Sequence, residues 1–366
     1  MAEPEPEEEA EGGFGGFGGF EEEEVAGGDE FMAVKPWLGA IKAPSDFVSP
    51  ARDFDKAPEI TIKLDYVHGY RAKDSRMNVY FNSEGHVVTH AAAVGFKTIV
   101  PSNESSPSEQ THNTDHTDDI MSIAQHPNKA IFATGEIGPK PKIFIWDSTN
   151  ECKTTLKIHK NTTKGIDTLG FSPDGNWLAC STMDDNHSIY VFDANTGDLS
   201  GHSKGSTKNT IGLMWDTDST FITYGNSHYK YWNFTPKNPP KGKECKAGAK
   251  WRDTIVSGVV HGDKCLHGAS NGEFQVWSKG GFLAGMSGKL HGSCLDAITV
   301  VRNDYILTGA KDHKICLLDP KTYKKVCEFD TYKFFPKTFN GNVRALDYCA
   351  STNSLAVGLF SAEIYQ

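Results

Sequence analysis

The sequence predicts an all-β fold, a β-propeller of seven blades, and three observations predict it. Apolar strand endings recur six times at nearly constant spacing, and a β-rich hairpin precedes them. The 36 glycines and many short apolar runs favour turns and strands over long helices. With 366 residues, 38% of them hydrophobic, the chain is long enough to bury a large core.

The repeated strand ending is the strongest of these signals. Measured at the closing aromatic residue or its substitute, the endings follow one another at intervals of 46, 40, 45, 41 and 47 residues. This spacing matches the period of about 40–45 residues that is typical of a WD-repeat blade. The six endings lie at residues 143–147, 189–193, 229–233, 274–278, 315–319 and 363–366.

The predicted hairpin at residues 78–100 supplies the seventh blade. Residues 78–81 and 86–94 are rich in β-branched and aromatic side chains, and Glu84-Gly85 forms a turn signal between them. Small residues recur at strand ends, as at Gly225, Gly309 and Gly358, where we expect the blades to crowd together. The propeller is therefore predicted to span residues 78–366.

The first 30 residues differ in composition from the rest of the chain. They hold 12 of the 47 acidic residues and no basic one, so the remainder carries 35 acidic against 37 basic residues. Glu-rich blocks flank a GGF repeat at residues 12–20, a composition that cannot bury enough apolar surface to fold. We predict a disordered acidic leader, in which the phenylalanines are either contacts for a partner or part of a flexible spacer.

Catalytic and metal-binding chemistry finds no support in the sequence. It contains no nucleophile elbow, no phosphate-binding loop and no HExxH motif, which predicts a non-enzyme without cofactor or metal. We interpret His112, His116, His187 and His202 as hydrogen-bonding residues of blade edges, and Asp119 and Asp167 as residues that fix turns. The eight isolated cysteines are predicted to be reduced core thiols.

Potential partners are narrowed by charge and hydropathy. No apolar run reaches the roughly 18 residues of a membrane span, and no signal peptide is visible, so we expect an intracellular protein without a membrane partner. No nucleic-acid motif or stacking platform occurs, which argues against nucleic acid. Three lysine groups could attract an acidic polymer: Lys237, Lys241, Lys243, Lys246, Lys250 and Arg252; Lys153, Lys157, Lys160 and Lys164; Lys321, Lys324, Lys325 and Lys333.

A resemblance to a known family adds to this interpretation. The apolar stretch 31–44, the Tyr-Val-His-Gly-Tyr-Arg run at 66–71 and residues 78–80 resemble the HELP motif of the echinoderm microtubule-associated protein-like family. Residues 116–127, with 133–135 and 145–147, are similar to the blade that follows that motif. The resemblance divides the chain into a leader (1–30), a HELP motif region (31–77) and a WD-repeat propeller (78–366). The residues expected to be structural in the motif are Trp37, Leu38, Ile41, Tyr66, Val67, Gly69, Tyr70 and Arg71.

The family resemblance implies a non-enzymatic protein of the cytoplasm and cytoskeleton that associates with tubulin or microtubules. It also implies a place in cilia for members with a short N-terminus, where other axonemal proteins are further partners. The first lysine group, Lys237 to Arg252, is the expected tubulin contact. Family members carry two propellers, so we expect a second one in a longer chain. The alternative is a general WD-repeat adaptor that binds proteins other than tubulin.

Overall fold

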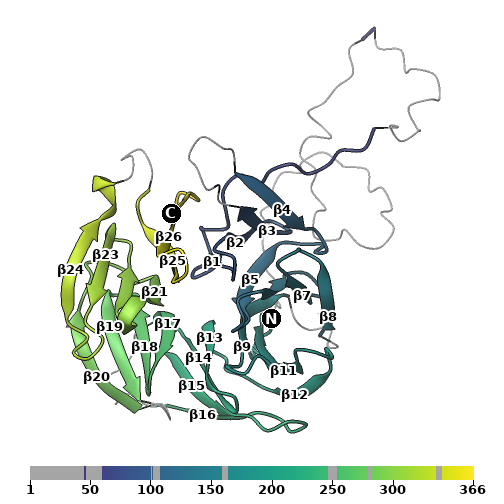
Figure 1. Ribbon diagram of the computed structural model, residues 1–366. Helices are drawn as coiled ribbons and strands as arrows, with labels where there is room; N and C mark the ends of the chain where they lie inside the picture. The colour runs from purple at the N-terminus through teal and green to yellow at the C-terminus, as the bar shows by residue number, and fades with distance from the viewer. Residues whose placement is uncertain are drawn as a thin grey trace, which may run out of the picture. The chain divides into compact units, whose positions relative to one another are not determined.

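Seven antiparallel sheets, each built from strands that are consecutive in the chain, form the unit Lys63–Gln366 (Figure 1). The computed structural model describes residues 45–46, 60–99, 101, 108–158, 164–245, 254–278, 282–334 and 340–366, with the backbone alone for 282–287. Six sheets have four strands and the seventh has three. The predicted seven-bladed β-propeller is therefore confirmed.

The first four blades run from residue 80 to residue 244. Blade 1 contains β1 (Tyr80–Phe81), β2 (Val87–Ala91), β3 (Val94–Ile99) and β4 (Glu109–Asn113). Blade 2 contains β5 (Ile120–Gln125), β6 (Ile131–Glu136), β7 (Lys142–Asp147) and β8 (Cys152–Lys157). Blade 3 contains β9 (Ile166–Phe171), β10 (Trp177–Thr182), β11 (Ile189–Asp193) and β12 (Leu199–Ser203). Blade 4 contains β13 (Thr210–Thr217), β14 (Thr220–Gly225), β15 (His228–Asn233) and β16 (Lys241–Glu244).

The last three blades complete the ring. Blade 5 contains β17 (Ile255–His261), β18 (Lys264–Ala269), β19 (Glu273–Ser278) and β20 (Phe282–Lys289). Blade 6 contains β21 (Ala297–Val300), β22 (Ile306–Gly309), β23 (Lys314–Leu318) and β24 (Lys325–Asp330). Blade 7 contains β25 (Val343–Cys349), β26 (Ser354–Leu359) and β27 (Ile364–Tyr365). Two short 3-10 helices also occur, η3 (Arg302–Asp304) and η4 (Thr331–Lys333).

The first strand of each blade lies at the centre of the ring, and in the four-stranded blades the fourth lies at its outside (Figure 1). Neighbouring first strands contact each other from β5 through β9, β13, β17 and β21 to β25, and β1 contacts β25. Each predicted strand ending is the third strand of its blade, from β7 to β27. The WD-repeat period therefore correctly located the third strand of each blade from blade 2 onward.

The core lies between adjacent blades. One cluster joins Val191 of blade 3 with Trp215 and Trp232 of blade 4, and Trp146 and Trp277 are also fully buried. Burying a large apolar side chain stabilises a fold by roughly 1.5–3 kcal/mol, so these contacts are the main force that holds the blades together. The predicted crowding at small residues is confirmed at Gly309, where a Cβ atom would lie 2.4 Å from Cγ1 of Val343 in the next blade.

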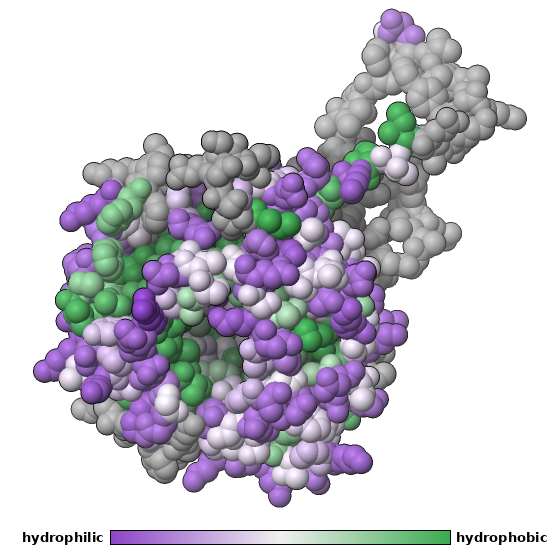
Figure 2. Space-filling model, in the orientation of Figure 1, coloured by the Kyte–Doolittle hydropathy of each residue, from purple (hydrophilic) through white to green (hydrophobic). Residues whose placement is uncertain are grey.

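Two sequence predictions need correction. The run 86–94 is not one strand, because β2 ends at Ala91, Ala92 turns the chain at φ 46°, and β3 begins at Val94. All eight cysteines are free and five are buried, but Cys327 of β24 is exposed rather than part of the core. Val326 and Phe329 on the same strand are 56% and 45% exposed, and apolar surface is visible at this edge of the ring (Figure 2). Among the described residues, no helix has the length and apolarity to cross a membrane.

Candidate functional site

The predicted tubulin contact is centred on β16, the outer strand of blade 4. Lys237 lies in the turn before this strand, at φ 63°, and is exposed. Lys241 and Lys243 are exposed on β16 and, being two residues apart, lie on one face of the strand. Lys246, Lys250 and Arg252 lie outside the described residues. The described lysines thus form a row along the strand rather than a compact cluster.

The charge on this face of β16 is not neutralised locally. Neither Lys241 nor Lys243 forms an ion pair with any residue that the structure describes. Glu244 points to the opposite face, where it is paired in register with Lys230 of β15. The Lys230 ammonium donates to the Gly205 carbonyl at 2.7 Å and lies 4.2 Å from the Trp232 ring centroid, and burial lowers its pKa. Lys230 is therefore a packing residue, while Lys241 and Lys243 are available to a partner.

The other two lysine groups are partly paired with carboxylates. On β8, Lys153 contacts Asp147 at 2.8 Å, and on β24, Lys325 contacts Glu328 at 2.6 Å. Lys314 of β23 also reaches Glu328, and these two lysines together lower the pKa of its carboxyl to about 2. Lys160 lies outside the described residues. Of the three groups, the one on β16 is the group in which no described lysine forms an ion pair with a described carboxylate.

The run at residues 66–71 connects the first blade to its neighbours. The Tyr66 hydroxyl lies 2.9 Å from Oγ of Ser108, just before β4. The Val67 amide donates to Oε1 of Gln110 on β4 at 2.7 Å. Gly69 adopts φ 80°, a conformation that favours glycine, and so supplies the turn before Tyr70.

Tyr70 and Arg71 extend these contacts to blades 7 and 2. The buried Tyr70 hydroxyl donates to the Leu359 carbonyl of β26 at 2.9 Å, and burial raises its pKa. Arg71 donates to Asp74 at 2.8 Å and to Asp119, just before β5, at 2.9 Å. Tyr66, Val67, Tyr70 and Arg71 thus make hydrogen bonds to the propeller, whereas Trp37, Leu38 and Ile41 lie outside the described residues.

The histidines at blade edges form hydrogen-bonded networks, as predicted for His116. Its Nδ1 lies 3.0 Å from a Glu136 carboxylate oxygen and its Nε2 lies 2.7 Å from the Thr134 hydroxyl, to which Trp146 donates at 3.0 Å. All four residues are buried. In blade 6, His291 repeats the pattern with Asp312 and Thr308.

Two further predicted histidines also have neighbours. His112 Nε2 lies 3.3 Å from Oε1 of Gln110, and burial lowers its pKa. The His202 ring lies 4.5 Å from the Tyr190 ring. Among the described residues, no group of three or more His, Cys, Asp or Glu side chains is arranged to hold a metal ion.

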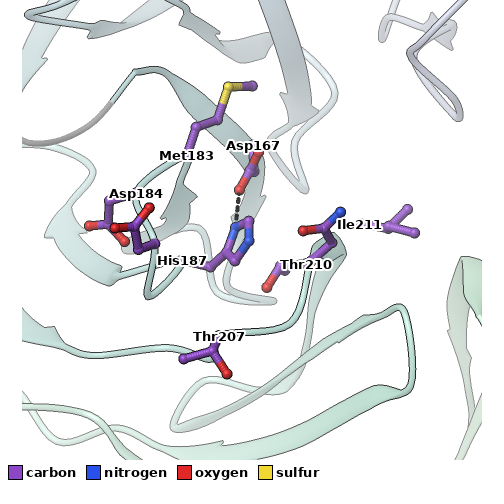
Figure 3. A pocket seen from close by; sticks show the side chains of 9 residues that line it. Asp167, Met183, Asp184, His187, Thr207, Thr210 and Ile211 are labelled. Carbon is purple, nitrogen blue, oxygen red and sulfur yellow. Dashed lines mark hydrogen bonds and ion pairs between the residues drawn. The ribbon is translucent and has the colours of Figure 1, made fainter. Parts of the chain in front are cut away.

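An open hollow of about 630 Å³ lies between blades 3 and 4 (Figure 3). Asp167, at the start of β9, accepts a hydrogen bond from Nδ1 of His187 at 2.6 Å. This bond raises the pKa of His187, while burial raises the pKa of the Asp167 carboxyl. Asp184 and Asp185 come from the connection between β10 and β11. The further lining residues are Met183, Thr207, Asn209, Thr210 and Ile211.

Comparison with family models identifies two matching regions. Residues 109–366 match the echinoderm microtubule-associated protein first β-propeller, which covers more than half of the chain. Residues 57–96 match the HELP motif. The motif match includes β1 and β2, so its residues and those of the first blade overlap.

Individual proteins support the same assignment. The chain is 30% identical over 321 residues to the ciliary WD repeat-containing protein ctxp80 of Euplotoides octocarinatus, covering 82% of this chain and 43% of that protein. It is 29% identical to echinoderm microtubule-associated protein-like 4 of Mus musculus (79% and 31% covered) and 29% identical to the 77 kDa echinoderm microtubule-associated protein of Strongylocentrotus purpuratus (74% and 41% covered). The chain thus spans less than half the length of these relatives.

A solved structure agrees on the fold. The Cps50 (Swd1) β-propeller domain of Myceliophteria thermophila aligns with a TM-score of 0.52 at 14% identity, covering 66% of this chain and 80% of that one. At this identity, the similarity concerns the fold alone.

Proposed function

This chain belongs to the echinoderm microtubule-associated protein-like family, and on that premise we propose that it binds tubulin or microtubules as a non-enzymatic cytoskeletal scaffold. The observation that carries the proposal is the family match over residues 109–366, together with relatives whose names include microtubule-associated proteins. The ciliary relative supports a place in the cilium or axoneme, where other axonemal proteins are further partners.

Lys237, Lys241 and Lys243 are the described part of the proposed contact. Clustered like charge attracts an acidic polymer at long range, and tubulin carries acidic tails. These exposed lysines form no ion pair with a described residue, so no such ion pair has to break when they bind tubulin. Lys246, Lys250 and Arg252 belong to the same proposed contact by sequence.

Co-sedimentation with stabilised microtubules tests this contact. We expect the full chain to pellet with microtubules at low salt and to dissociate as salt rises, because surface ion pairs are screened within about 10 Å at 0.1 M. Charge reversal by Lys241→Glu and Lys243→Glu should weaken binding several-fold. The matched control is Lys153→Glu with Lys157→Glu on β8, the outer strand of blade 2. Equal loss from both pairs would place the contact elsewhere, and no pelleting at low salt would refute tubulin binding.

The organisation of the whole protein also remains a proposal. The relatives are more than twice as long as the matched region, which supports a second propeller in a longer chain. We propose the leader 1–30, the motif region 31–77 and the propeller 78–366 as the parts of this chain.

An adaptor for non-tubulin proteins is the second candidate, and the hollow between blades 3 and 4 is the observation that favours it. A partner seated there would contact Asp185 and Thr207, which line the hollow, whereas Lys241 does not. Binding of a non-tubulin protein that Lys241→Glu leaves intact, but Asp185→Lys abolishes, would support the adaptor. Loss of all binding on Lys241→Glu would exclude it.

A further inference from the structure

The ring is closed between blade 7 and blade 1 without a shared strand. Both sheets are built from their own consecutive strands, β25–β27 and β1–β4, and no described strand belongs to both, although the Phe81 amide of β1 donates to Oδ2 of Asp347 on β25 at 2.7 Å. The first strand of blade 1 is also very short. β1 has two residues, whereas the first strands of the other blades have four to eight. Other contacts must therefore hold this seam together.

The segment before β1, residues 70–77, adds polar contacts to the buried apolar cluster that blades 1 and 7 share. Arg344 of β25 donates through Nε to the Ala72 carbonyl at 2.8 Å, and its carbonyl accepts from the Met77 amide at 3.1 Å. On the other side, Ser75 Oγ donates to the Met121 carbonyl of β5 at 3.4 Å. Tyr70 is bonded to blade 7, and the Arg71 amide donates to the His90 carbonyl of β2 in blade 1 at 2.9 Å, so the segment spans the seam from both sides and reaches blade 2 as well.

Asp296 ties this segment to a third blade. It lies directly before β21 of blade 6 and is fully buried. One carboxylate oxygen accepts from Nε of Arg76 at 2.7 Å, and the other accepts from Nη1 of Arg344 at 2.9 Å. The Arg344 side chain is 2% exposed and that of Arg76 is 24% exposed. Two arginines from distant parts of the chain therefore meet on one buried carboxylate.

We propose that residues 70–77 form a strap that locks the ring at the seam between blades 7 and 1, with Asp296 as its anchor. Loss of Arg76 leaves Asp296 paired with Arg344 but removes the ion pair to the strap, and the cost falls on the elements that meet at this carboxylate. Those elements are the strap, β25 and the start of β21. The strap is also continuous with β1, so release of the anchor opens the seam while blades 3 and 4 keep their own contacts.

Hydrogen exchange of backbone amides in the full chain tests the strap. In Arg76→Gln, we expect amides of β1 and β25 to exchange about a hundredfold faster than in the unchanged protein, because loss of the ion pair lowers the free energy of local opening at these strands. Amides of β9 and β13 should change by less than about threefold. The matched control is Lys314→Gln, which removes an exposed ion pair with Glu328 in blade 6 and should leave β1 and β25 unchanged.

The outcomes separate local opening from general destabilisation. Faster exchange confined to β1 and β25 supports the strap. Equal acceleration in all blades, or no difference from the Lys314→Gln control, overturns it. If Arg76→Gln yields no folded protein, Arg76→Lys keeps the charge and loses the planar donor geometry, and the same pattern is expected at about tenfold.

Discussion

Substitution of Tyr70 by phenylalanine measures how much one hydroxyl contributes to the contact between the motif and blade 7. Tyr70 is 5% exposed, and its hydroxyl donates at 2.9 Å to the carbonyl of the fully buried Leu359. Tyr70→Phe removes this bond, while the carbonyl keeps the Ala362 amide as a donor at 3.0 Å. A net hydrogen bond contributes about 1 kcal/mol, so we expect a loss of about 1 kcal/mol in unfolding free energy.

Gly358 gives the same contact a second probe. A Cβ atom at this position would lie 2.6 Å from the Tyr70 hydroxyl oxygen and 3.0 Å from Cζ. Gly358 does not have a positive φ, so Gly358→Ala costs energy mainly through crowding, about 1–3 kcal/mol. In the double variant Tyr70→Phe with Gly358→Ala, the hydroxyl oxygen is absent, and the shortest approach is 3.0 Å, between the new Cβ and Cζ of the ring. The double variant should therefore be more stable than the sum of the single effects predicts, by about 1 kcal/mol.

Urea unfolding of the four proteins forms a double-mutant cycle, read from the midpoints at constant m-value. Gly292→Ala is the matched control, because a Cβ there would meet no atom closer than 3.7 Å, and it should change stability by less than about 0.5 kcal/mol. Additive losses in the cycle would refute the argument that Tyr70 and Gly358 share one contact.

Three further predictions concern the histidine networks. Thr134→Val leaves His116 and Trp146 without their shared hydroxyl, so stability should fall by about 2–3 kcal/mol, and a loss below 0.5 in urea unfolding would contradict the network. Asp167 raises the pKa of His187, so the protonated imidazole stabilises the fold below about pH 6.5, and this stabilisation is lost as pH rises. In His187→Gln, the unfolding midpoint should therefore depend less steeply on pH. Burial lowers the pKa of His90 to about 3, so only the unfolded chain takes up a proton as pH falls below about 6.5, and stability is lost there. A histidine NMR titration that shows His90 protonating near pH 6 would disprove this.

The blades were predictable because they repeat. The third strands β7 to β27 share a local pattern of apolar residues closed by an aromatic side chain or its substitute, and the turn at 172–176 carries Pro, Asp and Gly. The break at Ala92 was missed because alanine is not a turn signal, whereas in the fold its φ is positive and its carbonyl accepts from the Ile120 amide of blade 2 at 2.8 Å. Local pattern thus predicts repeated elements better than single turns.

The anchor of the strap had no signal in the sequence, although Tyr70 and Arg71 at the start of the strap were expected to be structural. Arg76 lies in the motif region, but Asp296 is 220 positions away and stands in no motif. Their pairing depends on how the ring closes, which no local window contains. The lysine group on β16 shows the converse, because lysines that are neighbours in the sequence form a row along one face of a strand, with Glu244 on the other face.

The exposed thiol on the rim of blade 6 offers a route to single-site labelling. Desolvation raises the pKa of the Cys180 thiol, and the Cys265 side chain is fully buried. Because the thiolate is the reactive form of cysteine, these interior thiols should react slowly with maleimide. Cys327 is the exposed cysteine of the eight and should react first. A fluorophore attached there would mark one position on the ring's circumference. Energy transfer to labelled tubulin would then report which side of the propeller faces the filament.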